Sequence, residues 1–162
     1  MKEIAEIVEA DLNRAEHQND VLALTAAYAL DPMGNGGPLS TESLERLIPG
    51  LKSHPTTLIF LAYVEGKAVG IATCFRGFST FRARPLINIH DLAVRPEHRG
   101  RSIGQQLLRA VEQKAQELGC CRVTLEVQEH NTRARRLYEL AGFAQTVYAE
   151  PAGGALFYAK PL

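Results

Sequence analysis

The sequence has few cysteines, and their spacing suits neither a disulfide framework nor a metal site. Only three occur among 162 residues, at Cys74, Cys120 and Cys121. An odd number with one adjacent pair does not form a disulfide framework, and the spacing is not that of zinc ligands. We therefore expect these cysteines to be packing residues in a reducing compartment, and we expect no metal.

Long apolar runs are also missing. No stretch approaches the ~20 apolar residues that a transmembrane helix needs. The segment from Met1 to Glu6 is acidic and has no apolar core like that of a signal peptide. These absences predict a chain without a membrane partner and a cytoplasmic location.

The chain has no surplus of either charge, because Lys and Arg number 18 and Asp and Glu number 18. A general nucleic-acid binder needs a basic surplus to contact phosphates, so we expect no nucleic-acid partner. Hydrophobic residues make up 46% and charged residues 22% of the chain, as in ordinary globular proteins. The length suits one domain over residues 1–162 with a substantial core.

The most informative stretch is a predicted strand, loop and helix between Ile87 and Gly119. Apolar and β-branched residues run from Ile87 to Val94 and stop before Pro96, which cannot continue a central strand. A helical stripe of apolar residues then begins at Ile103. The next strand is expected over 122–128, parallel to the first.

The loop between this strand and helix has the composition of an anion site. Gly100 and Gly104 leave room for a ligand near the backbone. The free N–H groups at a helix start favour an anion, and Arg99 and Arg101 add positive charge. The loop predicts a seat for a phosphate or diphosphate, although such glycines also occur for steric reasons. No Gly-Lys-Ser/Thr follows, which excludes a nucleotide-hydrolysing P-loop.

The remaining pattern predicts a mixed α/β sheet with helices on both faces. Residues 3–10 fit either a helix or a short strand, and the breaker-rich run 31–38 is the most flexible-looking part of the chain. Residues 76–85 are expected to be a loop that either lines a substrate entrance or is simply solvated. The other predicted helices cover 13–30, a segment capped by Ser40, and 132–141, and the other strands cover 57–64, 68–75, 143–147 and 155–160.

A second cluster of interest begins at Asn131. On the predicted helix, Asn131, Arg135 and Tyr138 share one stripe. Such a tyrosine can pack its ring while its hydroxyl reaches a ligand, or it can merely cover the edge of the sheet.

Two motifs resemble signatures of one family. The run Val94-x-Pro96-x-x-Arg99-Gly100-x-x-Ile103-Gly104 resembles the acetyl-CoA signature of the GNAT superfamily of N-acetyltransferases. The run Asn131-x-x-Ala134-x-x-Leu137-Tyr138-x-x-x-Gly142-Phe143 is similar to its second signature, in the expected order. Ser102 stands where the family usually has Gly.

The resemblance implies a fold and a cosubstrate. The fold is α/β, with a mixed, mostly antiparallel sheet of six to seven strands that is splayed at its central parallel pair and flanked by about four helices. The cosubstrate is acetyl-CoA, whose pantetheine arm would pair with the splayed strand edge. The implied coenzyme-binding residues are Leu92, Ala93, Val94, Arg99, Gly100, Arg101, Ser102, Ile103, Gly104, Gln105, Asn131, Arg135 and Tyr138.

The resemblance also implies catalytic roles. Tyr138 is the expected general acid toward the leaving sulfur. His90 suits the general base because histidine titrates near neutrality, although a buried structural histidine is an equal alternative. Glu126 is the second candidate base, acting directly or through water. Asp91 faces away from His90 if the strand is regular, and it then supports the fold.

The function implied is acetyl transfer from acetyl-CoA to a primary amine by direct attack in a ternary complex. The stretch from Phe78 to Pro85 is similar to the branch that acetylates polyamines, which favours a small-molecule amine acceptor. The alternatives are acetylation of a protein or peptide amine, and a non-catalytic module that senses acyl-CoA. Family members are often dimers, so a homodimer is a possible assembly.

Overall fold

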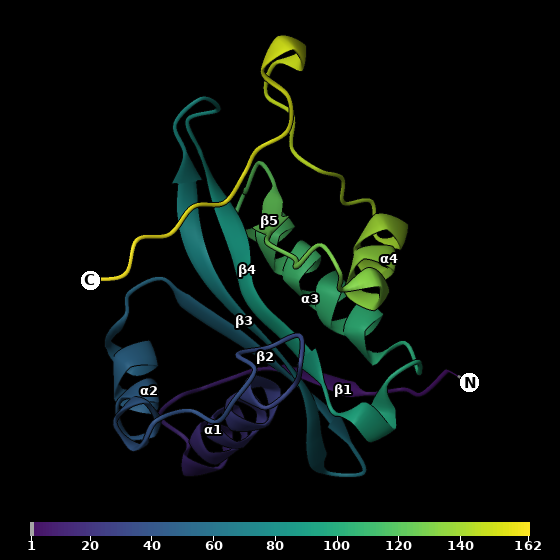
Figure 1. Cartoon of the computed structure of the whole chain (residues 1–162). Helices are drawn as coiled ribbons and strands as arrows, with labels where there is room; N and C mark the ends of the chain where they lie inside the picture. Colours follow the sequence, from purple (N-terminus) through teal and green to yellow (C-terminus); the bar gives the residue numbers. More distant parts are fainter. Residues whose placement is uncertain (1) are drawn as a thin grey trace. The chain divides into compact units, whose positions relative to one another are not determined.

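The computed structural model describes residues 2–162 and divides them into two compact units. One unit runs to Gln128 and the other from Glu129 to Leu162. The placement of one unit relative to the other is not determined (Figure 1), so each is described by itself. The expectation of a single domain over 1–162 therefore stays a prediction.

The first unit contains one five-stranded mixed sheet. Neighbouring strands are antiparallel, except that the last two run parallel. In sheet order the strands are β1 (Glu6–Glu9), β2 (Thr57–Val64), β3 (Lys67–Ser79), β4 (Arg84–Val94) and β5 (Val123–Leu125). The open choice for residues 3–10 is thus settled as a strand.

Helices cover both faces of this sheet, as the sequence predicts (Figure 1). They are α1 (Ala15–Ala29), α2 (Thr41–Ser53) and α3 (Ile103–Glu117), with a short 3-10 turn, η1 (Pro96–His98), before α3. Ile71 packs against α1, whereas a Cβ on the preceding Gly70 would lie 3.1 Å from Leu107 of α3. Consecutive strand residues point to opposite faces, so α1 and α3 lie on opposite sides.

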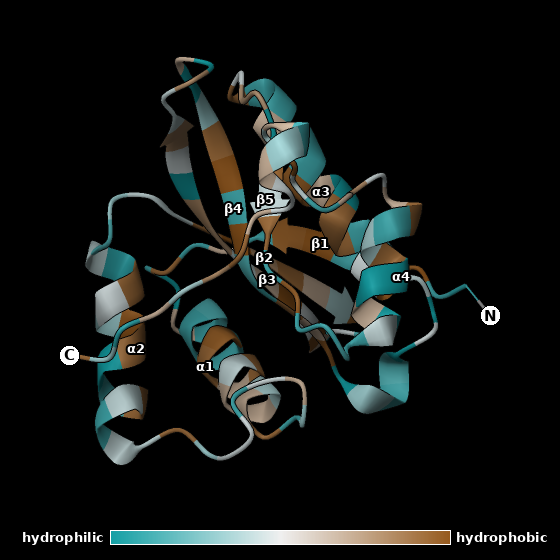
Figure 2. Ribbon diagram, turned by 45° about the horizontal axis from the view of Figure 1, so that its top comes forward, coloured by the Kyte–Doolittle hydropathy of each residue, from teal (hydrophilic) through white to brown (hydrophobic). Residues whose placement is uncertain are grey.

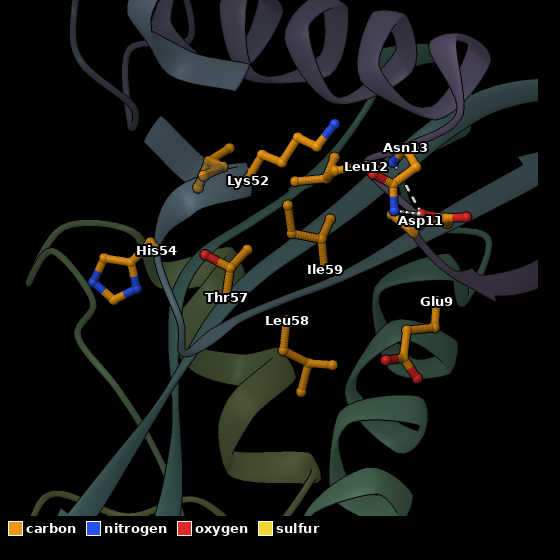
Figure 3. A pocket seen from close by; sticks show the side chains of 11 residues that line it. Glu9, Asp11, Leu12, Asn13, Lys52, His54, Thr57, Leu58 and Ile59 are labelled. Atoms are coloured by element: carbon orange, nitrogen blue, oxygen red, sulfur yellow. Dashed lines mark hydrogen bonds between the residues drawn. The ribbon is translucent and has the colours of Figure 1, made fainter. Parts of the chain in front are cut away.

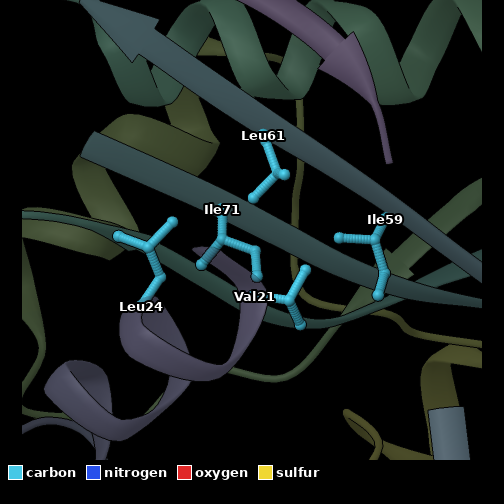
Figure 4. Close-up of a cluster of buried hydrophobic side chains, with 5 residues drawn as sticks. All are labelled: Val21, Leu24, Ile59, Leu61 and Ile71. Atoms are coloured by element: carbon cyan, nitrogen blue, oxygen red, sulfur yellow. The ribbon is translucent and has the colours of Figure 1, made fainter. Parts of the chain in front are cut away.

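The core between α1 and the sheet is apolar. Val21 and Leu24 of α1 meet Ile59, Leu61 and Ile71 of β2 and β3 (Figure 4). Burying each such side chain contributes about 1.5–3 kcal/mol. The central strands are accordingly the most hydrophobic part of the ribbon, while the outward faces of the helices are polar (Figure 2). No helix within residues 2–162 combines the length and the apolar character needed to cross a bilayer.

The Glu-Gly pair between the strands predicted over 57–64 and 68–75 indicates a hairpin, and the hairpin between β2 and β3 is confirmed. Glu65 and Gly66 both have left-handed backbone conformations, with φ of 49° and 74°. Two consecutive residues of this kind form the tight turn that matches the twist of antiparallel strands.

The expected count of six to seven strands is wrong, because the described residues form five. Residues 143–147 and 155–160 form no strand, and Val147 and Gly154 share only an isolated bridge. Leu156, Phe157 and Tyr158 are consecutive and exposed rather than alternating. An isolated pair of short strands is at best marginally stable, which explains why this segment forms no ladder within its own unit.

Two other boundaries differ from the prediction. Residues 76–85 are mostly a hairpin rather than a loop, because β3 and β4 stay paired as far as Ser79 and Arg84. The strand expected over 122–128 is confirmed only at Val123–Leu125. Beyond Leu125 the chain leaves β4 and has no ladder partner.

The second unit contains the predicted helix near residue 132. This helix, α4, spans Thr132–Leu140, and a 3-10 turn, η2, follows at Glu150–Ala152. The first unit's three helices and α4 together confirm the expected number of about four.

The loop between α1 and α2 gives a first prediction. A Cβ on Gly34 would lie 2.0 Å from the carbonyl oxygen of Tyr28, whereas a Cβ on Gly37 would meet no atom within 4 Å. We expect Gly34→Ala to lower the free energy of unfolding by about 1–3 kcal/mol. Gly37→Ala is the matched control and should leave it nearly unchanged. Urea unfolding measures both, and equal stabilities would show that Gly34 is not packed as described.

Candidate functional site

The parallel pair β4 and β5 opens after three residues. Ile87 to Ile89 pair with Val123 to Leu125, and β4 then continues to Val94 with only β3 beside it. The second edge of β4 therefore faces no strand of the first unit from His90 onward. This divergence is the splay that the resemblance implies.

Hydrogen bonding decides which backbone groups face the splay. Arg95 donates its N–H to the carbonyl oxygen of Val69 in β3, at 2.8 Å. Alternate residues of an antiparallel strand turn their backbone groups to the same side. Those of Ala93 therefore face β3, while those of Leu92 and Val94 face the splay. Of the three strand residues predicted to hold the pantetheine arm, two thus have backbone groups that face the splay.

The turn into α3 has an open backbone. Gly100 and Ser102 both have left-handed conformations, with φ of 75° and 68°. A Cβ on Gly100 would meet nothing within 4 Å. Left-handed backbone favours glycine at the position of Ser102, which is where the family usually has Gly.

The N-terminus of α3 is not capped by a side chain. Ser102 makes no capping bond, whereas Ser40 caps α2 by accepting from the N–H of Ser43. The first N–H groups of α3, from Ile103 to Gln105, therefore lack a side-chain acceptor. Such a terminus favours an anion.

The two arginines of this turn are held by carboxylates. Arg99 lies 2.5 Å from Asp31 and also donates from Nε to the carbonyl oxygen of Val94 at 2.8 Å. Arg101 lies 3.3 Å from Glu3, whose other oxygen is 2.9 Å from Nδ1 of His98. The sequence places both guanidinium groups at the anion seat but does not reveal these acidic partners.

The base candidate His90 lies at a β-bulge. Thr73 pairs with Asp91 and Cys74 pairs with Ile89, so His90 is an extra residue in β4. The ring of His90 packs edge-on against Phe75, with 5.6 Å between ring centroids, and Phe75 packs likewise against His54 at 5.0 Å. His90 is exposed, so the alternative of a buried structural histidine does not hold.

The bulge places Asp91 on the same face as His90. On β3, Thr73 and Phe75 point to one side of the sheet and Cys74 points to the other. Asp91, which pairs with Thr73, and His90, which packs against Phe75, therefore share that side. The strand is irregular here, and the expectation that Asp91 faces away from His90 does not apply. A bulge of this kind leaves no signal in the residue pattern.

Burial raises the pKa of the Asp91 carboxyl, and the nearby His90 partly offsets this rise. Burial also raises the pKa of Tyr28 on α1, with Asp91 and Asp31 adding to the effect. Asp91 is thus a desolvated carboxyl that faces α1. A cationic amine is the chemical group that such a carboxyl favours.

The second base candidate from the sequence, Glu126, follows the end of β5 and is exposed. It is not part of the ladder that carries His90.

The other predicted residues lie in the second unit. Tyr138 on α4 is 8% exposed, and its ring centroid lies 5.9 Å from that of Phe143. Asn131 caps α4 by accepting from the N–H of Ala134 at 3.2 Å, and Arg135 donates to the carbonyl oxygen of Glu129 at 3.1 Å. Asn131 is thus the N-cap of α4 and not a helical residue, while on the helix Arg135 is exposed and Tyr138 is buried.

A hollow of about 220 Å³ lies elsewhere in the first unit, where β1 leads toward α1 and α2 ends (Figure 3). Its lining includes Asp11, Asn13, Lys52, His54 and Thr57, and none of the predicted site residues. Within residues 2–162, no three His, Cys, Asp or Glu side chains are grouped as metal ligands.

Comparison with known proteins decides the family. The sequence profile of the acetyltransferase (GNAT) family matches residues 22–143, which is more than half of the chain. The chain belongs to the GNAT family. The family resemblance of the two motifs is thereby confirmed, and so is membership of a family of acyltransferases.

Two curated relatives carry related names. A thialysine N-epsilon-acetyltransferase of Bos taurus is 34% identical over 82 residues, which is 51% of this chain and 48% of that protein. The uncharacterized N-acetyltransferase YhfO of Bacillus subtilis (strain 168) is 30% identical over 95 residues, covering 59% and 63%. Each match thus spans less than two thirds of the relative.

Solved structures share the fold. A probable acetyltransferase superposes with a TM-score of 0.79 at 21% identity, covering 97% of each chain. An aminoglycoside acetyltransferase from an uncultured soil metagenomic sample, in complex with sisomicin, gives a TM-score of 0.76 at 22% identity, covering 98% of this chain and 97% of that one. The sheet and helices described above are therefore a GNAT fold.

The strained turn before α3 yields a second prediction. Ser102→Gly relieves a left-handed serine and should raise the free energy of unfolding by about 0.5–1 kcal/mol, after the entropic cost of glycine. Gly100→Ala, two residues away, should lower it by about 1–2 kcal/mol. Urea unfolding of both variants checks the pair, and a destabilised Ser102→Gly would contradict the backbone conformation.

The buried carboxyl yields a third prediction. Because folding raises the pKa of Asp91, the stability that comes with its protonated form is present at acid pH and lost as pH rises. Asp91→Asn should therefore be more stable than the wild type at pH 7, with an advantage that disappears below about pH 4. Thermal unfolding across this range measures it.

Asp11→Asn serves as a control of opposite sign. A hydrogen bond from the backbone of Asn13 lowers the pKa of Asp11, so its contribution to stability is present at neutral pH and lost on acidification. Asp11→Asn should be the less stable variant at pH 7. If the stability difference from the wild type changed with pH in the same direction for both variants, Asp91 would not be desolvated.

Proposed function

We propose that this chain is an N-acetyltransferase that moves the acetyl group of acetyl-CoA to a primary amine of a small molecule, by direct attack in a ternary complex. The observation that carries the proposal is the splay of β4 from β5, which leaves the amides of Leu92 and Val94 unpaired by any strand of the first unit. The open turn into α3 follows this edge along the chain.

The splayed edge and the turn suit the chemistry of the coenzyme. Pantetheine carries amide groups, which can hydrogen-bond a free strand edge as a peptide does. The uncapped start of α3, from Ile103 to Gln105, and the open backbone at Gly100 suit a diphosphate. When bound, the coenzyme supplies a thioester, whose C–S bond breaks as the amine nitrogen bonds to the acetyl carbon.

The chain's own groups would then handle the protons. His90 is exposed on the α1 face and beside Asp91, which suits accepting the proton that the amine loses. The structure adds Asp91 as a further candidate for that role, because it lies beside His90 and burial raises its pKa. Tyr138 is proposed to donate the proton that the departing thiolate gains, as the second signature implies.

The proposal of a small-molecule acceptor rests on the desolvated Asp91 carboxyl and on the name of a relative. The bovine relative is named a thialysine N-epsilon-acetyltransferase, and thialysine is a small amine. The Asp91 carboxyl, on the face of the sheet that α1 covers, favours a cationic amine over a neutral one.

The experiment is an amine panel with the purified chain, in which thiol release from acetyl-CoA is measured. The panel contains diamines, polyamines, thialysine, an aminoglycoside and a lysine-containing peptide. We expect saturation with a small amine. Saturation with the peptide alone would identify a protein amine as the acceptor, and coenzyme binding without any thiol release would identify a sensor. Calorimetry that detects no coenzyme binding would overturn the whole proposal.

The same assay tests the proposed acid. Tyr138→Phe should lower kcat by about a hundredfold or more, because the thiolate loses its proton donor, while the coenzyme Kd stays within about twofold. Tyr158→Phe, which alters an exposed tyrosine of the same unit, is the control. An unchanged kcat for Tyr138→Phe at every pH would remove this residue from the mechanism.

A further inference from the structure

The breaker-rich loop between α1 and α2 is more ordered than its composition indicates. The N–H of Gly34 donates to the carbonyl oxygen of Asp31 at 2.8 Å, and that of Gly37 to Ala29 at 3.1 Å. The hydroxyl of Tyr28 donates to the carbonyl oxygen of Met33 at 3.3 Å. Residues 31–37, here termed the acceptor loop, therefore hold one conformation through backbone contacts.

The Asp31 carboxylate accepts one hydrogen bond from within this loop and one from a residue outside it. One carboxylate oxygen accepts from the N–H of Met33 at 2.9 Å, and the other accepts from the guanidinium of Arg99 at 2.5 Å. The Asp31 side chain is 12% exposed and that of Arg99 is 24% exposed. An ion pair this sheltered is screened less by salt than a surface pair.

Arg99 in turn holds the end of β4. Its Nε donates to the carbonyl oxygen of Val94, one of the two residues whose backbone groups face the splay. Asp31, Arg99 and Val94 thus form a continuous chain of contacts from the acceptor loop to the edge proposed for the coenzyme arm.

The acceptor loop also contacts the other strand of the splay. Gln128, beyond the end of β5, donates from its side chain to the carbonyl oxygen of Met33 at 3.3 Å. The loop is therefore fastened on one side to the segment that follows β4 and on the other to the segment that follows β5. In the last turn of α1, just before this loop, the pKa of Tyr28 is raised by burial and further by Asp91.

We propose that Asp31 is a positioning residue which, through Arg99, couples the acceptor loop to the coenzyme edge of β4. This inference rests on the proposed transfer function and adds a residue outside both sequence motifs. Binding of the coenzyme arm at Val94 tightens the acceptor loop through this ion pair, and the amine is then held in register with the thioester. Coupling of this kind is reciprocal between the two ligands.

Asp31→Asn isolates the ion pair. The carbonyl oxygen of the asparagine keeps the bond from the N–H of Met33, so the local turn is retained, while an amide replaces the charge that faces Arg99. We expect the acceptor KM to rise about fivefold or more, with the coenzyme Kd within about twofold by calorimetry. Glu16→Gln, which makes the same carboxylate-to-amide change in an exposed pair with Arg14 outside this loop, is the control and should change neither. Thermal unfolding reports any general loss of structure.

A second measurement does not depend on turnover. Hydrogen exchange of the N–H groups of Met33, Gly34 and Gly37 is followed with and without free coenzyme A. We expect the coenzyme to slow exchange at these amides in the wild type and much less in Asp31→Asn. A wild-type chain that transfers acetyl to no amine would refute the proposed function, while this measurement would still decide the coupling.

Two results would overturn the inference. One is a coenzyme that leaves the exchange of the loop amides unchanged in the wild type. The other is an Asp31→Asn variant with an unchanged acceptor KM and tighter coenzyme binding, because Asp31 would then merely compete with the coenzyme for Arg99.

Discussion

The single extra residue in β4 is the constraint on which the candidate site depends. His90 has no partner in β3, and Ile89, directly before it, is the last residue of β4 that pairs with β5. A bulge bends the strand that carries it and increases its twist. The bend therefore falls where the parallel pair opens, so one local irregularity frees the edge of β4 and turns His90 and Asp91 toward α1.

Acidic residues offset the positive charge of the two arginines in the turn into α3. Arg99 and Arg101 each contact a carboxylate, from Asp31 and Glu3 respectively. Their charges are thus largely balanced within the chain. The anion preference of this turn rests instead on the backbone, on the uncapped N–H groups of α3 and on the open space at Gly100.

The sequence predicts those parts of the fold whose signal is local. The apolar runs of β2 and β3, the Glu65-Gly66 turn and the cap at Ser40 each depend on neighbouring residues, and all are confirmed. The strands expected near residues 147 and 157 depend on partners elsewhere in the chain, and they are not formed. The bulge at His90 likewise depends on register between strands, which a single strand's residues do not encode.

The acceptor loop shows why a breaker-rich composition does not establish mobility. Glycine widens the conformations open to a chain, but it also permits close packing, and Gly34 approaches the carbonyl of Tyr28 more closely than any side chain allows. Asp31 then adds an ion pair to Arg99, 68 positions further along the chain. Order in this loop comes from contacts that are distant in sequence. Such contacts lie where motif-based prediction has least to use.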